Sequence, residues 1–134
     1  MRRLSVALCT ALILPLAACQ GADKSVTVKG EASYLEKIAL PPGSMLHVQV
    51  VDTRPAEKPH VIAEDKFPAT GVPIPFQLEV EAAKIEPNVP YGVRASVRNV
   101  NEKLEFASDT ATPVDLKSPA PLEIQMNRAA GSHE

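Results

Sequence analysis

The sequence predicts an all-β fold, an antiparallel β-sandwich of about seven short strands. Several runs alternate apolar and polar residues with the period of two that is typical of half-buried strands. Thirteen prolines stand mostly between these runs and would interrupt any long helix. Strands that recur about every ten residues are typical of an antiparallel sandwich or barrel.

The segment before the first predicted strand resembles a secretory signal peptide. Arg2 and Arg3 precede an apolar stretch from Leu4 to Pro15, and small residues follow as far as Ala18. This stretch is shorter than the roughly 20 apolar residues that a membrane-spanning helix needs. We therefore expect residues 1–18 to be a signal peptide that is removed during export.

Cys19 closes the tetrad Leu-Ala-Ala-Cys, which resembles the lipobox of bacterial lipoproteins, whose cysteine is acylated and becomes the mature N-terminus. Stable attachment needs more than one acyl chain, at about 0.8 kcal/mol per buried CH₂. Several palmitate-like chains on Cys19 would meet that need. Gln20 follows, and in Gram-negative lipoproteins a residue other than aspartate here usually accompanies transport to the outer membrane. We expect a lipid-anchored protein on the periplasmic face of that membrane.

The remaining chain divides into three parts. Residues 19–25 are short and polar, as expected of a tether. Residues 26–128 hold the predicted sandwich, and residues 129–134 form a tail that we expect to fray. Cys9 lies in the signal peptide and Cys19 takes the lipid, so no thiol remains for disulfides, catalysis or metal binding.

Seven runs make up the predicted sheet, and most are bounded by turn-forming residues. The runs are Val26–Gly30, Leu46–Val50, Val61–Phe67, Phe76–Val80, Tyr91–Arg98, Leu104–Ala107 and Leu122–Met126. Pro42 and Gly43 favour a type II turn before the second run, because proline presets φ at the first central position and glycine takes positive φ at the second. Glu81–Ile85 predicts one helical turn, which Pro87 ends.

Composition excludes several classes of partner. The net charge is −2 and becomes more negative once Arg2 and Arg3 are removed, which argues against nucleic-acid binding and against electrostatic attraction to anionic lipid. The chain has no tryptophan, two tyrosines and three phenylalanines, so the core is aliphatic and a sugar site built on aromatic platforms is not expected. No small-molecule substrate is evident, and the expected membrane contact is the lipid on Cys19.

The titratable residues predict no catalytic residue, no metal site and no cofactor. His47 alternates with apolar neighbours and should point away from the core. Glu64 and Asp65 are adjacent in a strand and therefore face opposite ways, so they cannot act as a pair of acids. Asp109 lies in a sequence typical of an Asx turn. We predict that the protein is not an enzyme, and a small envelope hydrolase that uses the scattered carboxylates is the weaker alternative.

Two segments are candidates for binding a partner. Arg94 and Arg98 share the polar face of a central strand, which predicts either a solvated face or a patch that recognises carboxylates. The run Val72–Phe76 has proline at every second residue, which removes ladder donors from one side of an edge strand. These prolines either protect the edge from unwanted pairing or leave Ile74 and Phe76 beside a groove that receives a partner segment.

A series of short motifs gives the chain a family resemblance over Val26 to Val114. In order they are Tyr34–Gly43, Val48–Asp52, Val61–Glu64, Pro73–Phe76, Ile85 with Pro87, Tyr91 with Arg94-Ala95, and Phe106–Pro113. Their order and spacing resemble the YbaY-like lipoproteins, which are grouped with the YscW-type lipoprotein chaperones, or pilotins, of type III secretion. The charged stretch Asp52–Pro59 and the run Phe106–Asp109 depart from the family pattern, which affects the choice of partner more than the fold.

The resemblance implies a β-sandwich on the periplasmic side of the outer membrane. For the pilotin branch it also implies that the protein brings a secretin subunit to that membrane and helps it assemble. We therefore predict a non-catalytic, pilotin-like binding module for a segment of an envelope or secretion protein. A lipoprotein that maintains the envelope without a dedicated partner is the alternative.

Overall fold

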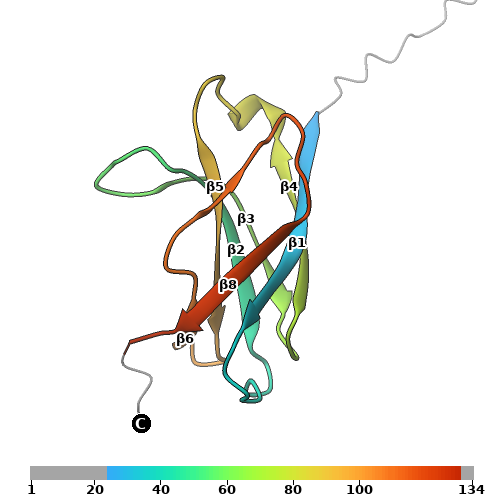
Figure 1. Cartoon of the computed structure of the whole chain (residues 1–134), viewed down its shortest axis with the longest axis vertical. Helices are drawn as coiled ribbons and strands as arrows, with labels where there is room; N and C mark the ends of the chain where they lie inside the picture. Colours follow the sequence, from blue (N-terminus) through green and yellow to red (C-terminus); the bar gives the residue numbers. More distant parts are fainter. Residues whose placement is uncertain (1–23, 131–134) are drawn as a thin grey trace, which may run out of the picture.

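The computed structural model describes residues 24–130, which form one curled, eight-stranded sheet and a single turn of 3₁₀ helix (Figure 1). The elements are β1 (Ser25–Tyr34), β2 (Met45–Asp52), β3 (His60–Pro68), β4 (Ile74–Glu81), η1 (Ala82–Lys84), β5 (Tyr91–Arg98), β6 (Leu104–Ala107), β7 (Thr112–Val114) and β8 (Leu122–Arg128). The predicted all-β class is confirmed.

The strand order is β3-β2-β5-β6-β8-β1-β4, and β7 pairs with β5 beside β6. The sheet curls into a nearly closed barrel, with β8 lying diagonally across β1 (Figure 1). All pairings are antiparallel except that of β1 with β8, which is parallel from Gly30–Leu122 to Tyr34–Met126. The prediction of a purely antiparallel sheet was wrong at this one ladder, because the last strand returns along the first and covers its free side.

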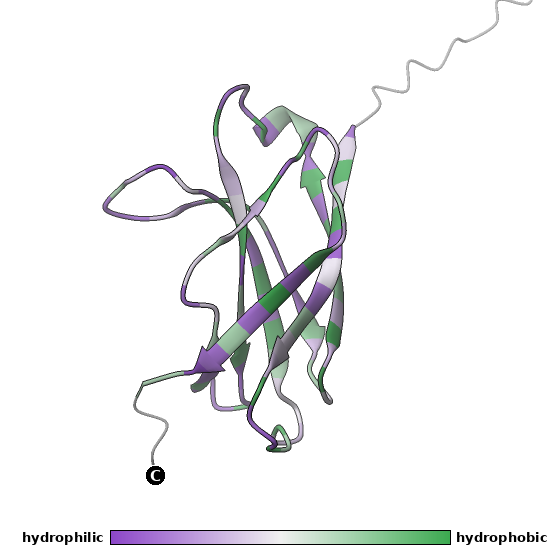
Figure 2. Ribbon diagram, viewed as in Figure 1, coloured by the Kyte–Doolittle hydropathy of each residue, from purple (hydrophilic) through white to green (hydrophobic). Residues whose placement is uncertain are grey.

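The core follows the predicted alternation, visible as green and purple bands along the strands in Figure 2. Most buried residues of β2, β4, β5 and β8 share one parity within each strand, as Leu46, Val48 and Val50 do. Val51, at a bulge, and Gly92 are the exceptions. Tyr34 and Phe106 stack inside, with ring centroids 4.1 Å apart. Aliphatic side chains thus fill the barrel, and the buried tyrosine hydroxyl donates to the Ile38 carbonyl at 2.9 Å.

The turn chemistry also agrees with the sequence. The Ser44 amide donates to the Pro41 carbonyl at 3.2 Å, and Gly43 has φ of +82°, as expected at the second central position of a type II turn. The helical turn expected at Glu81–Ile85 is η1. A short strand that the sequence did not predict, β7, includes Pro113. β7 lies at the margin of the sheet, where a missing donor costs little.

Candidate functional site: an apolar groove where the barrel stays open

The two end strands of the sheet, β3 and β4, are consecutive in sequence and lie close together, but no ladder joins them within residues 24–130. The barrel therefore has one seam. The prediction that Val72–Phe76 begins an edge strand is confirmed, since β4 is the last strand in the order.

The open side of β4 lacks backbone donors where the strand begins. The Ala82 amide donates to the Lys24 carbonyl at 2.8 Å, so even-numbered residues of this segment turn their amides toward β1. Odd-numbered residues turn theirs toward the seam. Pro75 is one of them, and it has no amide hydrogen to offer.

The facing end of β3 is blocked in the same way. The Ala69 amide donates to the Ser44 carbonyl of the β2 side at 2.9 Å, which places Pro68 with its nitrogen toward the seam. One pair of residues earlier, the Lys66 amide is occupied by the Asp65 carboxylate at 2.8 Å. At this end of the seam, both strands therefore lack free backbone donors that could pair them.

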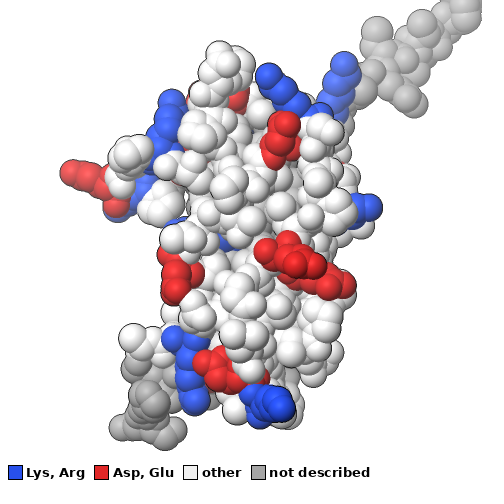
Figure 3. Space-filling model, in the orientation of Figure 1, with Lys and Arg blue, Asp and Glu red and all other residues white. Residues whose placement is uncertain are grey.

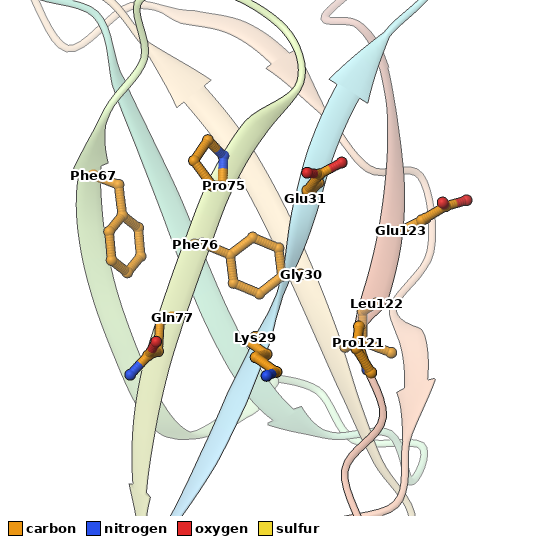
Figure 4. A pocket seen from close by; sticks show the side chains of 10 residues that line it. All are labelled: Lys29, Gly30, Glu31, Phe67, Pro75, Phe76, Gln77, Pro121, Leu122 and Glu123. Atoms are coloured by element: carbon orange, nitrogen blue, oxygen red, sulfur yellow. The ribbon is translucent and has the colours of Figure 1, made fainter.

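A groove of about 540 Å³ opens at this end (Figure 4). Its apolar lining comes from three strands or their ends, β3, β4 and β8: Phe67, Pro75, Phe76, Pro121 and Leu122. Phe67 is half-buried, whereas Phe76 is buried at 5% exposure and closes the floor. The volume is within the range of about 300–1,000 Å³ that is typical of ligand and side-chain pockets.

Gly30 lets β8 lie close enough to β1 to line the groove. It is paired with Phe76 of β4 on one side and with Leu122 of β8 on the other. A Cβ atom here would approach the Leu122 carbonyl oxygen to 2.2 Å, so only glycine lets β8 cross β1 this closely.

The rim of the groove is charged. Glu31 and Glu123 are direct partners in the parallel ladder between β1 and β8, and both side chains are exposed. Neither forms an ion pair with any residue in the range 24–130. Figure 3 shows acidic side chains gathered where β8 crosses β1. Like charges directly opposite one another destabilise a sheet by a few tenths of a kcal/mol, so this pair favours a cation from outside.

The other end of the seam is polar. A second hollow of about 400 Å³ lies between the start of β3 and the end of β4, and Glu64, Glu79, Glu81 and Lys84 line it. Glu79 accepts hydrogen bonds from Thr27 at 2.7 Å and Ser25 at 2.8 Å, and these bonds hold its pKa below the ordinary glutamate value.

Glu64, in the same hollow, is held by the sheet behind it. Gln49 Nε2 and His47 Nε2 lie 3.0 and 3.1 Å from its carboxylate, and the hydrogen bonds from Gln49 and then His47 lower its pKa. The polar end therefore holds carboxylates that are already partnered by the protein, unlike those on the groove rim.

The structure brings only some of the predicted site residues together. Phe76 lines the groove, whereas Ile74 is 1% exposed, packs in the core and does not line the groove. Arg94 and Arg98 lie elsewhere, in a recess on β2 and β5. Cys19 and Gln20 lie outside the described residues. Within residues 24–130 no three histidine, cysteine or acidic side chains converge as metal ligands, and no helix has the length and apolarity to cross a membrane.

Sequence reasoning missed the residues that complete the groove, Gly30, Phe67 and Leu122. One signal was present: a glycine inside a strand pattern indicates close approach of another backbone. The neighbour that approaches it, β8, comes from the far end of the chain, and nothing local identifies it.

Comparison with known proteins shows which family has this architecture. A family model described as type III secretion system lipoprotein chaperone, YscW, matches residues 23–126. The chain belongs to the YscW family. The resemblance seen in the sequence is thereby confirmed, and the family is one of lipoprotein chaperones.

Two relatives of this YscW-family chain are informative. It is 33% identical over 98 residues to the uncharacterized lipoprotein YbaY of Escherichia coli K12, covering 71% of this chain and 51% of that protein, so it spans about half the length of the curated relative. It also matches the structure of an alternative pilotin from the type II secretion system of Vibrio cholerae. That match has a TM-score of 0.71 and 30% identity, covering 81% of this chain and all of the pilotin chain.

Proposed function

We propose that this chain is a non-catalytic, lipid-anchored assembly chaperone on the periplasmic face of the outer membrane, whose groove binds an amphipathic segment of a secretion or envelope protein, such as a secretin subunit. The observation that carries the proposal is the apolar groove at the seam between β3 and β4. The family and the fold shared with a pilotin support the same role.

The chemistry of the groove favours a helix over an added strand. Strand addition depends on main-chain hydrogen bonds along a free edge. Pro68 and Pro75 remove donors from both edges at the groove, while Phe67, Phe76 and Leu122 offer apolar surface. An amphipathic helix needs no backbone partner and buries side chains at intervals of three and four residues.

The rim specifies the charge of the partner. Glu31 and Glu123 are exposed neighbours that form no ion pair among the described residues, although Lys29 also lines the groove. A lysine or arginine beside the apolar face of the partner segment would sit between the two carboxylates. We therefore expect a partner segment that combines aliphatic residues with at least one basic residue.

The anchor belongs to the same proposal. A lipidated Cys19 would leave residues 20–24 as a tether before β1, so the domain would stand close to the membrane in which a partner assembles. Replacing Cys19 with alanine should release the folded protein from the membrane fraction on cell fractionation. Retention of the Cys19→Ala chain in that fraction would contradict the anchor.

The groove is tested by site-specific photocrosslinking in intact cells. A photoreactive amino acid at Phe67 should trap one discrete envelope protein, whereas the same group at Glu57, in the exposed loop between β2 and β3, should not. Crosslinks from Phe67 to lipid alone, or the same products from both positions, would overturn the proposal and favour a general envelope-maintenance role.

A further inference from the structure

A second, smaller recess lies on the outer face of β2 and β5, on strands that do not line the groove. In β5 the residues Val93, Ala95 and Val97 enter the core, so Arg94, Ser96 and Arg98 face outward. The register pairs Arg94 with Gln49 of β2 and Ser96 with His47. This recess has a volume of about 180 Å³, and its lining includes both arginines, Gln49, Ser96, Leu104 and Ser108.

The arginines in this recess have no carboxylate partner. Neither Arg94 nor Arg98 forms an ion pair with any residue from 24 to 130. Arg94 Nη2 donates to Gln49 Oε1 at 2.9 Å, and Arg98 Nη1 donates to the Glu102 carbonyl at 2.9 Å. Uncharged acceptors thus hold both guanidinium groups in place, and no carboxylate among the described residues forms an ion pair with either of them.

Arg94 also has an unpaired hydrogen-bond donor. Its Nε is shielded from solvent and has no hydrogen-bond acceptor. On an ordinary solvated sheet face, water would serve this donor, and buried donors in folded proteins nearly always have a partner. An oxygen bound beside the guanidinium, reached by a small rotation of the side chain, would supply one.

The neighbouring groups suit an oxyanion. The Ser108 hydroxyl oxygen already accepts the Ala95 amide hydrogen at 3.1 Å, so its own hydrogen is free to donate to a ligand. Leu104 lowers the local polarity on one side. The volume admits a single small group and not a whole metabolite.

The local charge selects among oxyanions. Glu64 lies just beyond Gln49 and accepts its Nε2 hydrogen at 3.0 Å, so one negative charge already stands near the two positive ones. A monoanion balances the remainder, while a doubly charged phosphate would be repelled by Glu64. We propose that this recess binds one carboxylate group of a peptide, from an acidic side chain or a chain terminus, with Arg94 as its fork-shaped donor. The proposal is independent of the groove.

The test uses the full lipoprotein in detergent micelles, labelled with ¹⁵N-arginine, and follows the guanidinium Nε–H signals by NMR. Titration with sodium acetate should shift the Arg94 and Arg98 signals saturably, and sodium chloride of equal ionic strength should not. Arg54, whose guanidinium is already paired with Asp52, is the internal control and should not respond. Arg94→Gln should weaken the acetate response of Arg98 at least tenfold, and Arg94→Lys should not restore it, because lysine lacks the fork.

Three results would overturn the proposal. An equal response to chloride would indicate simple screening, and phosphate binding as tight as acetate would contradict carboxylate selection. Unchanged acetate binding in Arg94→Gln would place the anion elsewhere. The dispersed amide spectrum of each variant reports whether it is folded, and Arg54→Gln is the matched control for loss of one surface arginine.

A peptide arm distinguishes the two sources of the carboxylate. A short peptide with a free C-terminus and no acidic side chain is compared with its C-terminal amide and with an amidated peptide that contains glutamate. Binding by either carboxylate-bearing peptide supports the proposal and identifies the source. Binding of the amide without any carboxylate would overturn it.

Discussion

The two ends of the seam between β3 and β4 lie between the same pair of strands, yet they differ in chemistry. At the hairpin end, Pro68 and Pro75 remove backbone donors and aromatic rings line an apolar groove. At the far end, the hollow is lined by carboxylates such as Glu79, which the protein itself already satisfies. The seam therefore offers apolar surface at one end and, at the other, carboxylates that are hydrogen-bonded to the neighbouring strands β1 and β2.

The largest loss of stability is expected from Gly30→Ala, because this change would displace β8, which lines the groove at the apolar end of the seam. The added Cβ would meet the Leu122 carbonyl oxygen at 2.2 Å, and forcing β8 away from β1 should cost about 3 kcal/mol in the free energy of unfolding. Urea denaturation measures the loss. Gly71→Ala is the matched control, since nothing lies within 4 Å of the added atom there, and equal losses in the two variants would contradict the role of Gly30.

Phe67→Ala should affect binding of a partner more than stability. Phe67 is half-buried on the groove wall, so its removal should cost about 1 kcal/mol of stability but weaken partner binding tenfold or more, as expected for an aromatic contact at the centre of an interface. The affinity of the purified protein for the crosslinked partner measures this. Glu79→Gln at the polar end should leave the affinity unchanged, and a similar loss there would remove the distinction between the two ends.

Charge reversal at the rim should separate stability from binding. Glu123→Lys replaces the repulsion with Glu31 by an attraction and should raise the free energy of unfolding by about 0.5 kcal/mol. The same change should weaken binding of a basic partner segment several-fold, whereas Glu123→Gln should give an intermediate result on both scales. A variant that binds more tightly as it becomes more stable would contradict a basic partner.

The smallest effect concerns the dependence of stability on pH at the polar end. Hydrogen bonds from Thr27 and Ser25 lower the pKa of Glu79 in the folded protein, so their contribution is fully present above about pH 4.3, the ordinary glutamate value, and is lost as the pH falls through the folded value. Thr27→Val removes one of these bonds and should flatten the acid limb of stability. Denaturation curves at a series of pH values from neutral to acid measure the slope, and an unchanged slope would contradict the assignment.

The local pattern predicted most of this fold. Alternation identified the core residues of β2, β4, β5 and β8, and Gly43 identified its turn. The parallel pairing of β1 with β8 could not be predicted, because a strand with alternating apolar residues can pair with either a parallel or an antiparallel neighbour. The register across distant strands also stayed hidden, and a bulge at Val50–Val51 shifts it between β2 and β3.

The residues that line the groove were hard to predict for the same reason, because they depend on contacts between distant strands. Ile74 and Phe76 have the same parity in β4, and both were candidates for contact with a partner. Only Phe76 pairs with Gly30 across the ladder, at the point where the missing side chain lets β8 cross β1 and complete the groove lining. Which of two equivalent positions becomes a site is decided by a residue that lies more than forty positions away in the sequence.

The parallel ladder also has a consequence for how the protein folds. Among residues 24–130, β8 alone joins the β1–β4 pair to the β3-β2-β5-β6 ladder, and it is the last of the described strands. The two halves therefore become one sheet only after the C-terminal strand is available, which makes closure a late, long-range event.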